Sequence, residues 1–134
     1  MTKKVVKALR VLSFGALLSI FTCGLVADFI KSSTIAKMGQ IYGEDARRRA
    51  SALNALMASL QNASVQEKLV KVNDFFNALR WTTDMEVWGK KDYWATRMEF
   101  LGKGAGDCED YVIAKYFTLK QLGVPTDKLY FTYV

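Results

Sequence analysis

The feature that most constrains this chain is a glycine-rich turn that leads directly into a strongly patterned helix. Residues 102–107 read GKGAGD, and three glycines in five residues allow positive φ angles or a close approach of the backbone to other groups. The apolar residues that follow recur at helical spacing as far as Gly123, and Pro125 lies two residues beyond it. The pattern predicts a helix over 108–122, with Asp107 as its N-cap.

Two further helices are predicted upstream of this turn. Between residues 44 and 62, apolar side chains recur every three or four positions, which is typical of an amphipathic helix. Residues 64–67, SVQE, match a capping box, in which the serine oxygen accepts a backbone N–H and the glutamate side chain reaches back. A second helix is therefore expected from this box to about residue 79.

The remaining segments lack a sustained helical period. Residues 81–101 contain three tryptophans, and we expect a loop with short structured pieces whose aromatic side chains cover the core rather than contact a substrate. Residues 128–134, KLYFTYV, are rich in aromatic and β-branched residues and predict a strand that runs to the last residue. A single strand needs partners that no other segment supplies, so the chain is expected to hold part of an α+β domain.

The first 27 residues have the order of regions found in an export signal. Four basic residues precede the apolar run 11–21, and small residues follow this run. Cleavage would occur after residue 24 or after residue 27. We therefore predict a signal peptide over 1–27, a mature domain over 28–134 and a periplasmic location. The alternative is an uncleaved inner-membrane anchor, because residues 11–30 are interrupted only by Asp28.

Composition excludes several classes of function. Four of the 19 basic residues lie before residue 27, where no acidic residue occurs, so the net charge of +6 reflects targeting and no nucleic-acid partner is expected. The 134 residues contain no histidine, so neither a Ser-His-Asp nor a Cys-His pair can be completed within them. Cys23 lies in the predicted signal peptide, which leaves Cys108 as the one thiol of the mature chain.

Cys108 falls in the first turn of the predicted helix 108–122. Free N–H groups and the helix dipole favour a thiolate there, and neighbouring amides could bind an oxyanion, although a small apolar residue at a helix start is the plainer interpretation. Asp107, Glu109 and Asp110 would disfavour the thiolate by repulsion. A Ca²⁺ ion bound by their oxygens would neutralise them; alternatively, the acids only cap the helix and favour its positive end.

These residues carry a resemblance to a known family. The block GDCED with its downstream helix, preceded by KLVKVNDFFN and DYWATRMEF, resembles the bacterial transglutaminase-like cysteine peptidases of the LapG type, over residues 68–134. The resemblance implies a papain-like, transglutaminase-like α+β fold in which a cysteine opens a helix that packs on an antiparallel sheet. This chain would supply the N-terminal helices, the cysteine-bearing helix and the first core strand.

The resemblance also implies a function and its site residues. Cys108 matches the nucleophile, and Asp107 and Glu109, with Asp110 assisting, match acids that bind Ca²⁺. Family members cleave large surface adhesins in the periplasm and so control biofilm attachment, and an inner-membrane cyclic-di-GMP receptor sequesters them. The family's histidine and aspartate lie on strands beyond residue 134, so the chain is expected to be an inactive fragment; alternatively, it is a non-catalytic protein that competes for the receptor or for calcium.

Overall fold

The computed structural model describes residues 28–132, and its first part is a helical hairpin. Helix α1 (Ser32–Tyr42) and helix α2 (Glu44–Ser59) are joined at Gly43, which has a φ of +90°. The buried face of α2 carries apolar side chains at the predicted spacing, namely Ala46, Ala50, Leu53 and Met57. The predicted helix over 44–62 is therefore confirmed, and α1 is an element that the sequence pattern did not indicate.

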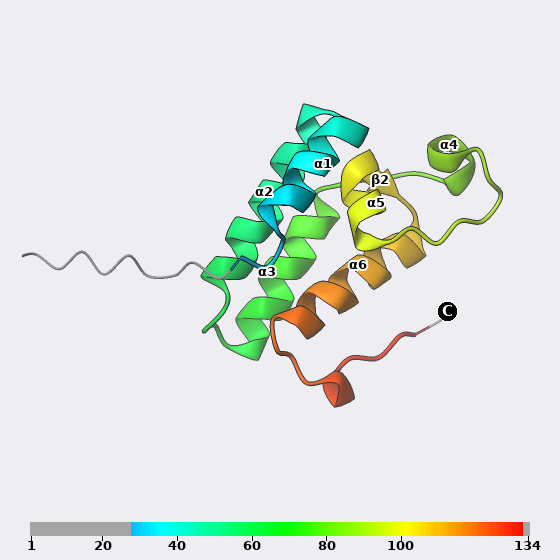
Figure 1. Cartoon of the computed structure of the whole chain (residues 1–134). Helices are drawn as coiled ribbons and strands as arrows, with labels where there is room; N and C mark the ends of the chain where they lie inside the picture. The colour runs from blue at the N-terminus through cyan, green and yellow to red at the C-terminus, as the bar shows by residue number, and fades with distance from the viewer. Residues whose placement is uncertain (1–27, 133–134) are drawn as a thin grey trace, which may run out of the picture.

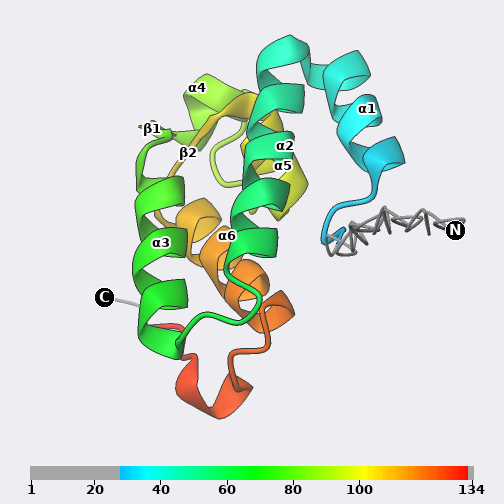
Figure 2. The ribbon, with the colours of Figure 1, turned by 90° about the vertical axis from the view of Figure 1, so that its left-hand side faces the viewer.

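Helix α3 (Val65–Asn77) and helix α6 (Cys108–Gln121) pack against each other, and α2 lies beside α3 in the view of Figure 2. Both were predicted within one or two residues of their ends. The side chain of Ser64 accepts from the Glu67 amide at 3.2 Å, but no return bond from the Glu67 side chain forms. The predicted capping box is thus only half present, although the helix begins where it was expected.

The chain between α3 and α6 leaves the helical layer and returns to it. Strand β1 (Arg80–Trp81) is followed by α4 (Asp84–Trp88), α5 (Arg97–Lys103) and β2 (Ala105–Gly106), and the two short strands pair in parallel, with Arg80 opposite Ala105 (Figure 1). Helix α5 opens with a complete capping box between Thr96 and Glu99. A mostly helical structure with a small sheet agrees with the predicted α+β class.

Helix α5 is fixed at its N-terminal end by the capping box and at its C-terminal end by an arginine of α2. At its C-terminal end, Arg49 of α2 donates from Nε to the Leu101 carbonyl at 2.6 Å and from Nη2 to the Gly102 carbonyl at 2.8 Å. These are carbonyls that the helix itself leaves unpaired. Gly104 then reverses the chain with a φ of +67°, one of the roles predicted for the glycine-rich turn. The turn is therefore held by contacts from a helix more than 50 residues away in sequence.

Aromatic contacts in the core join α5 to α3 and α6. The rings of Phe76 and Phe100, both fully buried, stack with centroids 6.1 Å apart. Tyr111 of α6 meets Phe100 edge-on at 4.7 Å. Phe100 thus links the short helix before the glycine-rich turn to the longer helices α3 and α6.

The strand predicted over 128–134 does not form in the described residues. Thr126–Lys128 is a 3₁₀ helix, and residues 129–132 pair with no strand. Phe131 instead packs on the Tyr116 ring of α6, with centroids 4.5 Å apart. The β propensity of this segment is real, but without a neighbouring strand its backbone groups have no ladder to join.

Two of the three tryptophans also differ from expectation. Trp88 is partly buried and lies 4.6 Å from the Tyr93 ring, as a core-covering residue should. Trp81 and Trp94 are 61% and 67% exposed, so the prediction that the aromatic residues of 81–101 cover the core is wrong for them.

The predicted signal peptide over 1–27 lies outside the described residues. Within residues 28–132, none of the helices combines the length and the apolar character that a membrane crossing needs.

We expect Phe100→Ala to lower the free energy of unfolding by about 3–5 kcal/mol, because it removes a fully buried ring and leaves a cavity between three helices. Chemical denaturation of the purified chain followed by circular dichroism measures this change. Phe117→Ala is a matched control, since its ring is 49% exposed and its loss should cost far less. Equal losses for the two variants would contradict the assigned core.

Candidate active site

Cys108 is the first residue of α6, and it is exposed. Asp107 occupies the N-cap position, as predicted, but its side chain makes no capping hydrogen bond to the helix. One of its carboxylate oxygens, Oδ1, is buried without a partner. A side-chain capping hydrogen bond from Asp107 is therefore absent, and its buried Oδ1 has no partner among residues 28–132.

Asp110 lies on the other side of the cysteine, inside the protein. It has no exposed surface, and its Oδ1 accepts from the Ala95 amide at 2.8 Å, whereas its Oδ2 has no partner. A Cβ atom at position 106 would collide with Oδ2, so only glycine lets the carboxylate approach the backbone there. This is the close approach for which the glycine-rich turn was singled out.

Asp84, the first residue of α4, brings a third buried carboxylate to the same place. It is 2% exposed, its Oδ2 accepts from the Tyr93 amide, and its Oδ1 has no partner. Carboxylate oxygens of Asp84, Asp107 and Asp110 lie within 4.8 Å of one another, as do those of Asp84, Asp92 and Glu109. We call these five residues the acidic cluster.

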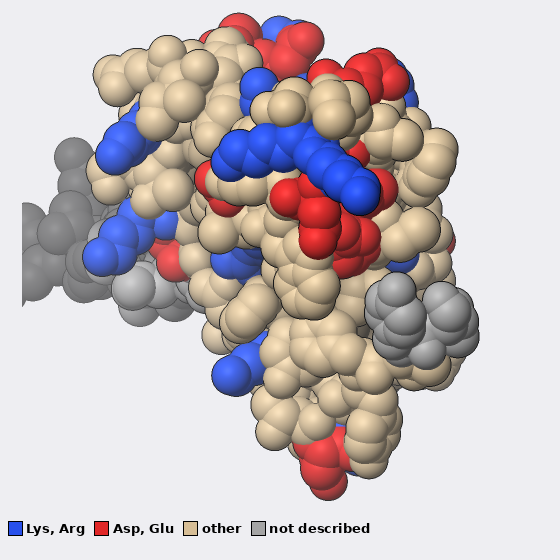
Figure 3. All heavy atoms as spheres, turned by 90° about the vertical axis from the view of Figure 1, so that its right-hand side faces the viewer, with Lys and Arg blue, Asp and Glu red and all other residues tan. Residues whose placement is uncertain are grey.

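A hard cation fits the acidic cluster. Three buried carboxylate oxygens without partners, one each from Asp84, Asp107 and Asp110, are costly unless a proton or a cation satisfies them. Oxygen-only donors at this spacing suit Ca²⁺ better than a soft metal. On the side of the molecule where α4 lies, Figure 3 shows acidic side chains gathered in a patch.

The electrostatics of the acidic cluster agree with this fit. Burial raises the pKa of Asp107 to about 7, with further contributions from Glu109, Asp84 and Asp110. Burial also raises the pKa of Asp110, against the opposing effect of the Ala95 amide. Both shifts mean that the charged forms are disfavoured in the absence of a counter-ion.

The four residues singled out from the sequence lie at the start of α6, and the acids Asp107, Glu109 and Asp110 belong to the acidic cluster. The sequence analysis missed Asp84 and Asp92, which lie 15 or more positions upstream of the cysteine. A local signal for Asp84 did exist, because an aspartate after two threonines, TTD, is a common helix start, but nothing in the sequence points it at α6.

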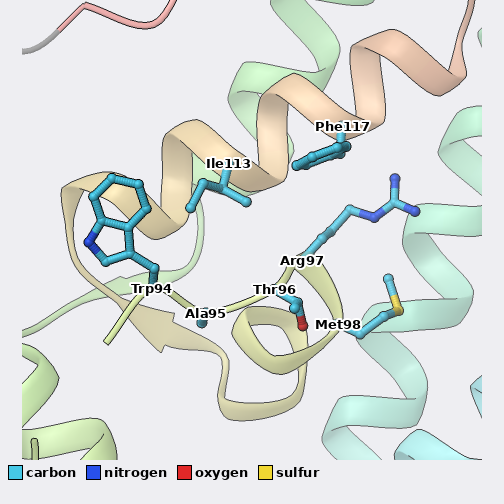
Figure 4. A pocket seen from close by; sticks show the side chains of 7 residues that line it. All are labelled: Trp94, Ala95, Thr96, Arg97, Met98, Ile113 and Phe117. Atoms are coloured by element: carbon cyan, nitrogen blue, oxygen red, sulfur yellow. The ribbon is translucent and has the colours of Figure 1, made fainter. Parts of the chain in front are cut away.

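Two hollows flank the residues of α6. One, of about 440 Å³, is lined by Cys108 together with Trp81, Tyr111 and Lys115 among others. The other, of about 350 Å³, lies between α6 and the start of α5; Figure 4 shows Trp94 at one end, Phe117 and Arg97 at the other, and Ile113 between them. Only the first of these reaches the thiol.

We expect the metal-free chain to lose stability as the pH rises from about 4 to about 7. The pKa of Asp107 is raised from 3.8 to about 7 in the folded protein, so the unfolded chain releases its proton first and deprotonation favours unfolding in this interval. Thermal unfolding in a chelator at several pH values measures the trend. Asp107→Asn should flatten it, and a melting temperature that rises with pH would contradict the assignment.

The chain is similar to known proteins over most of its length. Residues 42–134 match the family described as bacterial transglutaminase-like cysteine proteinase BTLCP. Calcium-bound LapG from Legionella pneumophila is 43% identical with a TM-score of 0.61, and the match covers 74% of this chain and 55% of that one. EGTA-treated LapG from the same organism is also 43% identical, with a TM-score of 0.62, and the match covers 76% of this chain and 55% of that one.

The matched region accounts for only part of these relatives. The chain spans little more than half the length of LapG, and no curated protein sequence matches it. The family match nevertheless includes α2, the acidic cluster and α6, and the structural match holds at high identity over three quarters of the chain. The chain therefore belongs to the bacterial transglutaminase-like cysteine proteinases.

Proposed function

We propose that these residues form the nucleophile and cation-binding part of a LapG-like, calcium-dependent cysteine peptidase. The observation that carries the proposal is an exposed cysteine at the first position of α6, beside three buried carboxylate oxygens that lack partners. Neither feature is explained by packing. A peptidase site requires the first, and a bound cation explains the second.

Cys108 is the proposed nucleophile. Its Sγ would attack the carbonyl carbon of a peptide bond, and the free amides of the first turn of α6 would stabilise the oxyanion that forms. Acyl transfer also needs a group that takes the thiol proton and returns a proton to the leaving amine. The 134 residues contain no histidine for this purpose, so we propose that they do not hydrolyse peptides by themselves.

Calcium is the proposed cation. Asp107, Glu109 and Asp110 would hold it together with Asp84 and Asp92, and it would neutralise the acidic cluster next to the thiol. Support comes from the fit of the unpartnered oxygens and from the calcium-bound and EGTA-treated states in which LapG has been solved.

The biological setting is proposed from the family resemblance. The chain would be exported to the periplasm, where the substrate is the N-terminal region of a large surface adhesin whose cleavage controls biofilm attachment. An inner-membrane receptor for cyclic-di-GMP would be the regulatory partner. The similarity to LapG, at 43% identity over about three quarters of the chain, supports the peptidase assignment on which this setting rests.

Calcium should stabilise the chain. A ligand that binds only the folded state contributes about 2.7 kcal/mol at 100 times its Kd, so the melting temperature should rise with added Ca²⁺. Asp84→Asn should abolish the rise, because it removes a buried ligand oxygen, whereas Asp74→Asn on exposed α3 surface should leave it intact. Isothermal titration provides the second measurement. No calcium-dependent shift in the unmodified chain would overturn the cation assignment.

Peptidase activity can be tested by grafting. Residues 28–132 would replace the matching part of Legionella pneumophila LapG, and cleavage of a recombinant adhesin segment would be followed by gel electrophoresis. We expect the graft to cleave in Ca²⁺, to stop on chelation, and to lose activity by at least about 10³-fold in Cys108→Ser, because the nucleophile is gone.

The 134-residue chain and a Ser59→Ala graft serve as controls. The chain alone should not cleave, and the second graft, altered at the exposed end of α2, should retain full activity. Cleavage that survives Cys108→Ser would rule out the assigned nucleophile.

A further inference from the structure

The groove that reaches Cys108 has a polar end that the proposed chemistry does not use. Its volume is about 440 Å³, and it lies between α6 on one side and the C-terminal end of α3 and strand β1 on the other. Trp81 and Val112, 61% and 40% exposed, form apolar walls. At the end away from Cys108, the ammonium of Lys115 is the charged group.

The groove follows one face of α6. Cys108, Tyr111, Val112 and Lys115 are spaced by three, four and seven residues, so they lie along the same side of the helix. Seven residues of α-helix correspond to about 10 Å along the axis, which an extended peptide spans in about three residues. A peptide whose scissile carbonyl lies at Cys108 would thus reach Lys115 within three residues.

The described residues hold Lys115 in place through neutral groups. Its Nζ donates to Asn73 Oδ1 at 2.8 Å and to Asn77 Oδ1 at 2.6 Å, and lies 5.6 Å from the centre of the Tyr111 ring. Tyr111 is itself fixed by a hydrogen bond from its hydroxyl to the Leu79 carbonyl at 2.8 Å. Among residues 28–132, no carboxylate forms an ion pair with Lys115.

The environment of this ammonium favours an anionic partner. Burial lowers the pKa of Lys115, since the charged form loses hydration and gains only neutral amide oxygens. An ammonium has three N–H donors, and the two asparagines take two of them. The third donor and the uncompensated charge are available to a carboxylate that enters the groove.

We propose that this groove is a specificity subsite for an acidic residue of the peptide substrate, with Lys115 as the residue that binds its carboxylate. The acidic residue lies about three positions from the bond that Cys108 attacks. Trp81 and Val112 pack against the aliphatic part of the side chain and the peptide between the two points. This inference rests on the proposed peptidase function and names the substrate chemistry at its site.

The test uses affinity labels, because they need the thiol but no general base. Peptides carry either a C-terminal chloromethyl ketone or an N-terminal bromoacetyl group, with one glutamate or one glutamine at each of four positions from the electrophile. The sulfur of Cys108 forms a C–S bond as the carbon–halogen bond breaks, the halide leaves, and the thiol proton passes to buffer. Mass spectrometry of the full chain measures the rate, and peptide mapping assigns it to Cys108.

With the glutamate about three positions from the electrophile, we expect the glutamate peptide to label Cys108 at least about tenfold faster than the matching glutamine peptide. One charge-assisted hydrogen bond to Lys115 accounts for a ratio of this size. The ratio should fall with added salt. Lys115→Met should bring it to one and Lys115→Arg should retain it, while Lys120→Met, on exposed α6 surface, should leave it unchanged.

Equal rates for the paired peptides at every position, or a ratio that persists in Lys115→Met, would overturn the proposal. Should Lys115→Met fail to fold by circular dichroism, the salt dependence and Lys115→Arg decide the matter. If the LapG graft does not cleave but the glutamate peptide still labels faster, the proposed peptidase function is rejected and the binding of an acidic residue is not. Cleavage by the graft with a ratio of one would reject the subsite alone.

Discussion

The site depends on a carboxylate that is held inside the protein. Asp110 has no exposed surface, and the hydrogen bond that its Oδ1 accepts from the Ala95 amide joins the cysteine helix to the segment before α5. That bond fixes the loop after α4, and with it Asp84, against the start of α6. A buried charge with one free oxygen is costly, so the arrangement that builds the site also favours whatever neutralises it. Protonation and cation binding are the two available ways.

The sequence predicted the parts of the fold that local patterns determine. The apolar spacing of α2, α3 and α6 and the glycines before Cys108 each act within a few residues, and their predictions are confirmed. The prediction of a strand over 128–134 was wrong for the described residues, because a segment with β propensity forms a strand only when another strand pairs with it. The prediction that Trp81 and Trp94 cover the core was wrong for a related reason. The size of a side chain does not determine which elements pack over it.

The same distinction holds for the site. The acids adjacent to Cys108 in sequence were identified from the sequence. Asp84 could not be found in this way, because it joins them only when the chain folds back and places the start of α4 near β2 and the start of α6. The Lys115 groove is likewise a product of packing, in which asparagines on α3 orient a lysine on α6. Long-range contacts of this kind leave no periodic trace in a single sequence.

The parallel pairing of two very short strands has a consequence for the order of folding. Pairing of residues 80–81 with 105–106 closes the loop that holds α4, the segment with Asp92 and α5, and loop closure carries an entropic cost. A partly folded chain without this pairing would display the thiol beside Asp107, Glu109 and Asp110 but without Asp84 and Asp92. Three acids of the cluster are thus tied to the cysteine by the sequence itself, whereas Asp84 and Asp92 reach it only through closure of this loop.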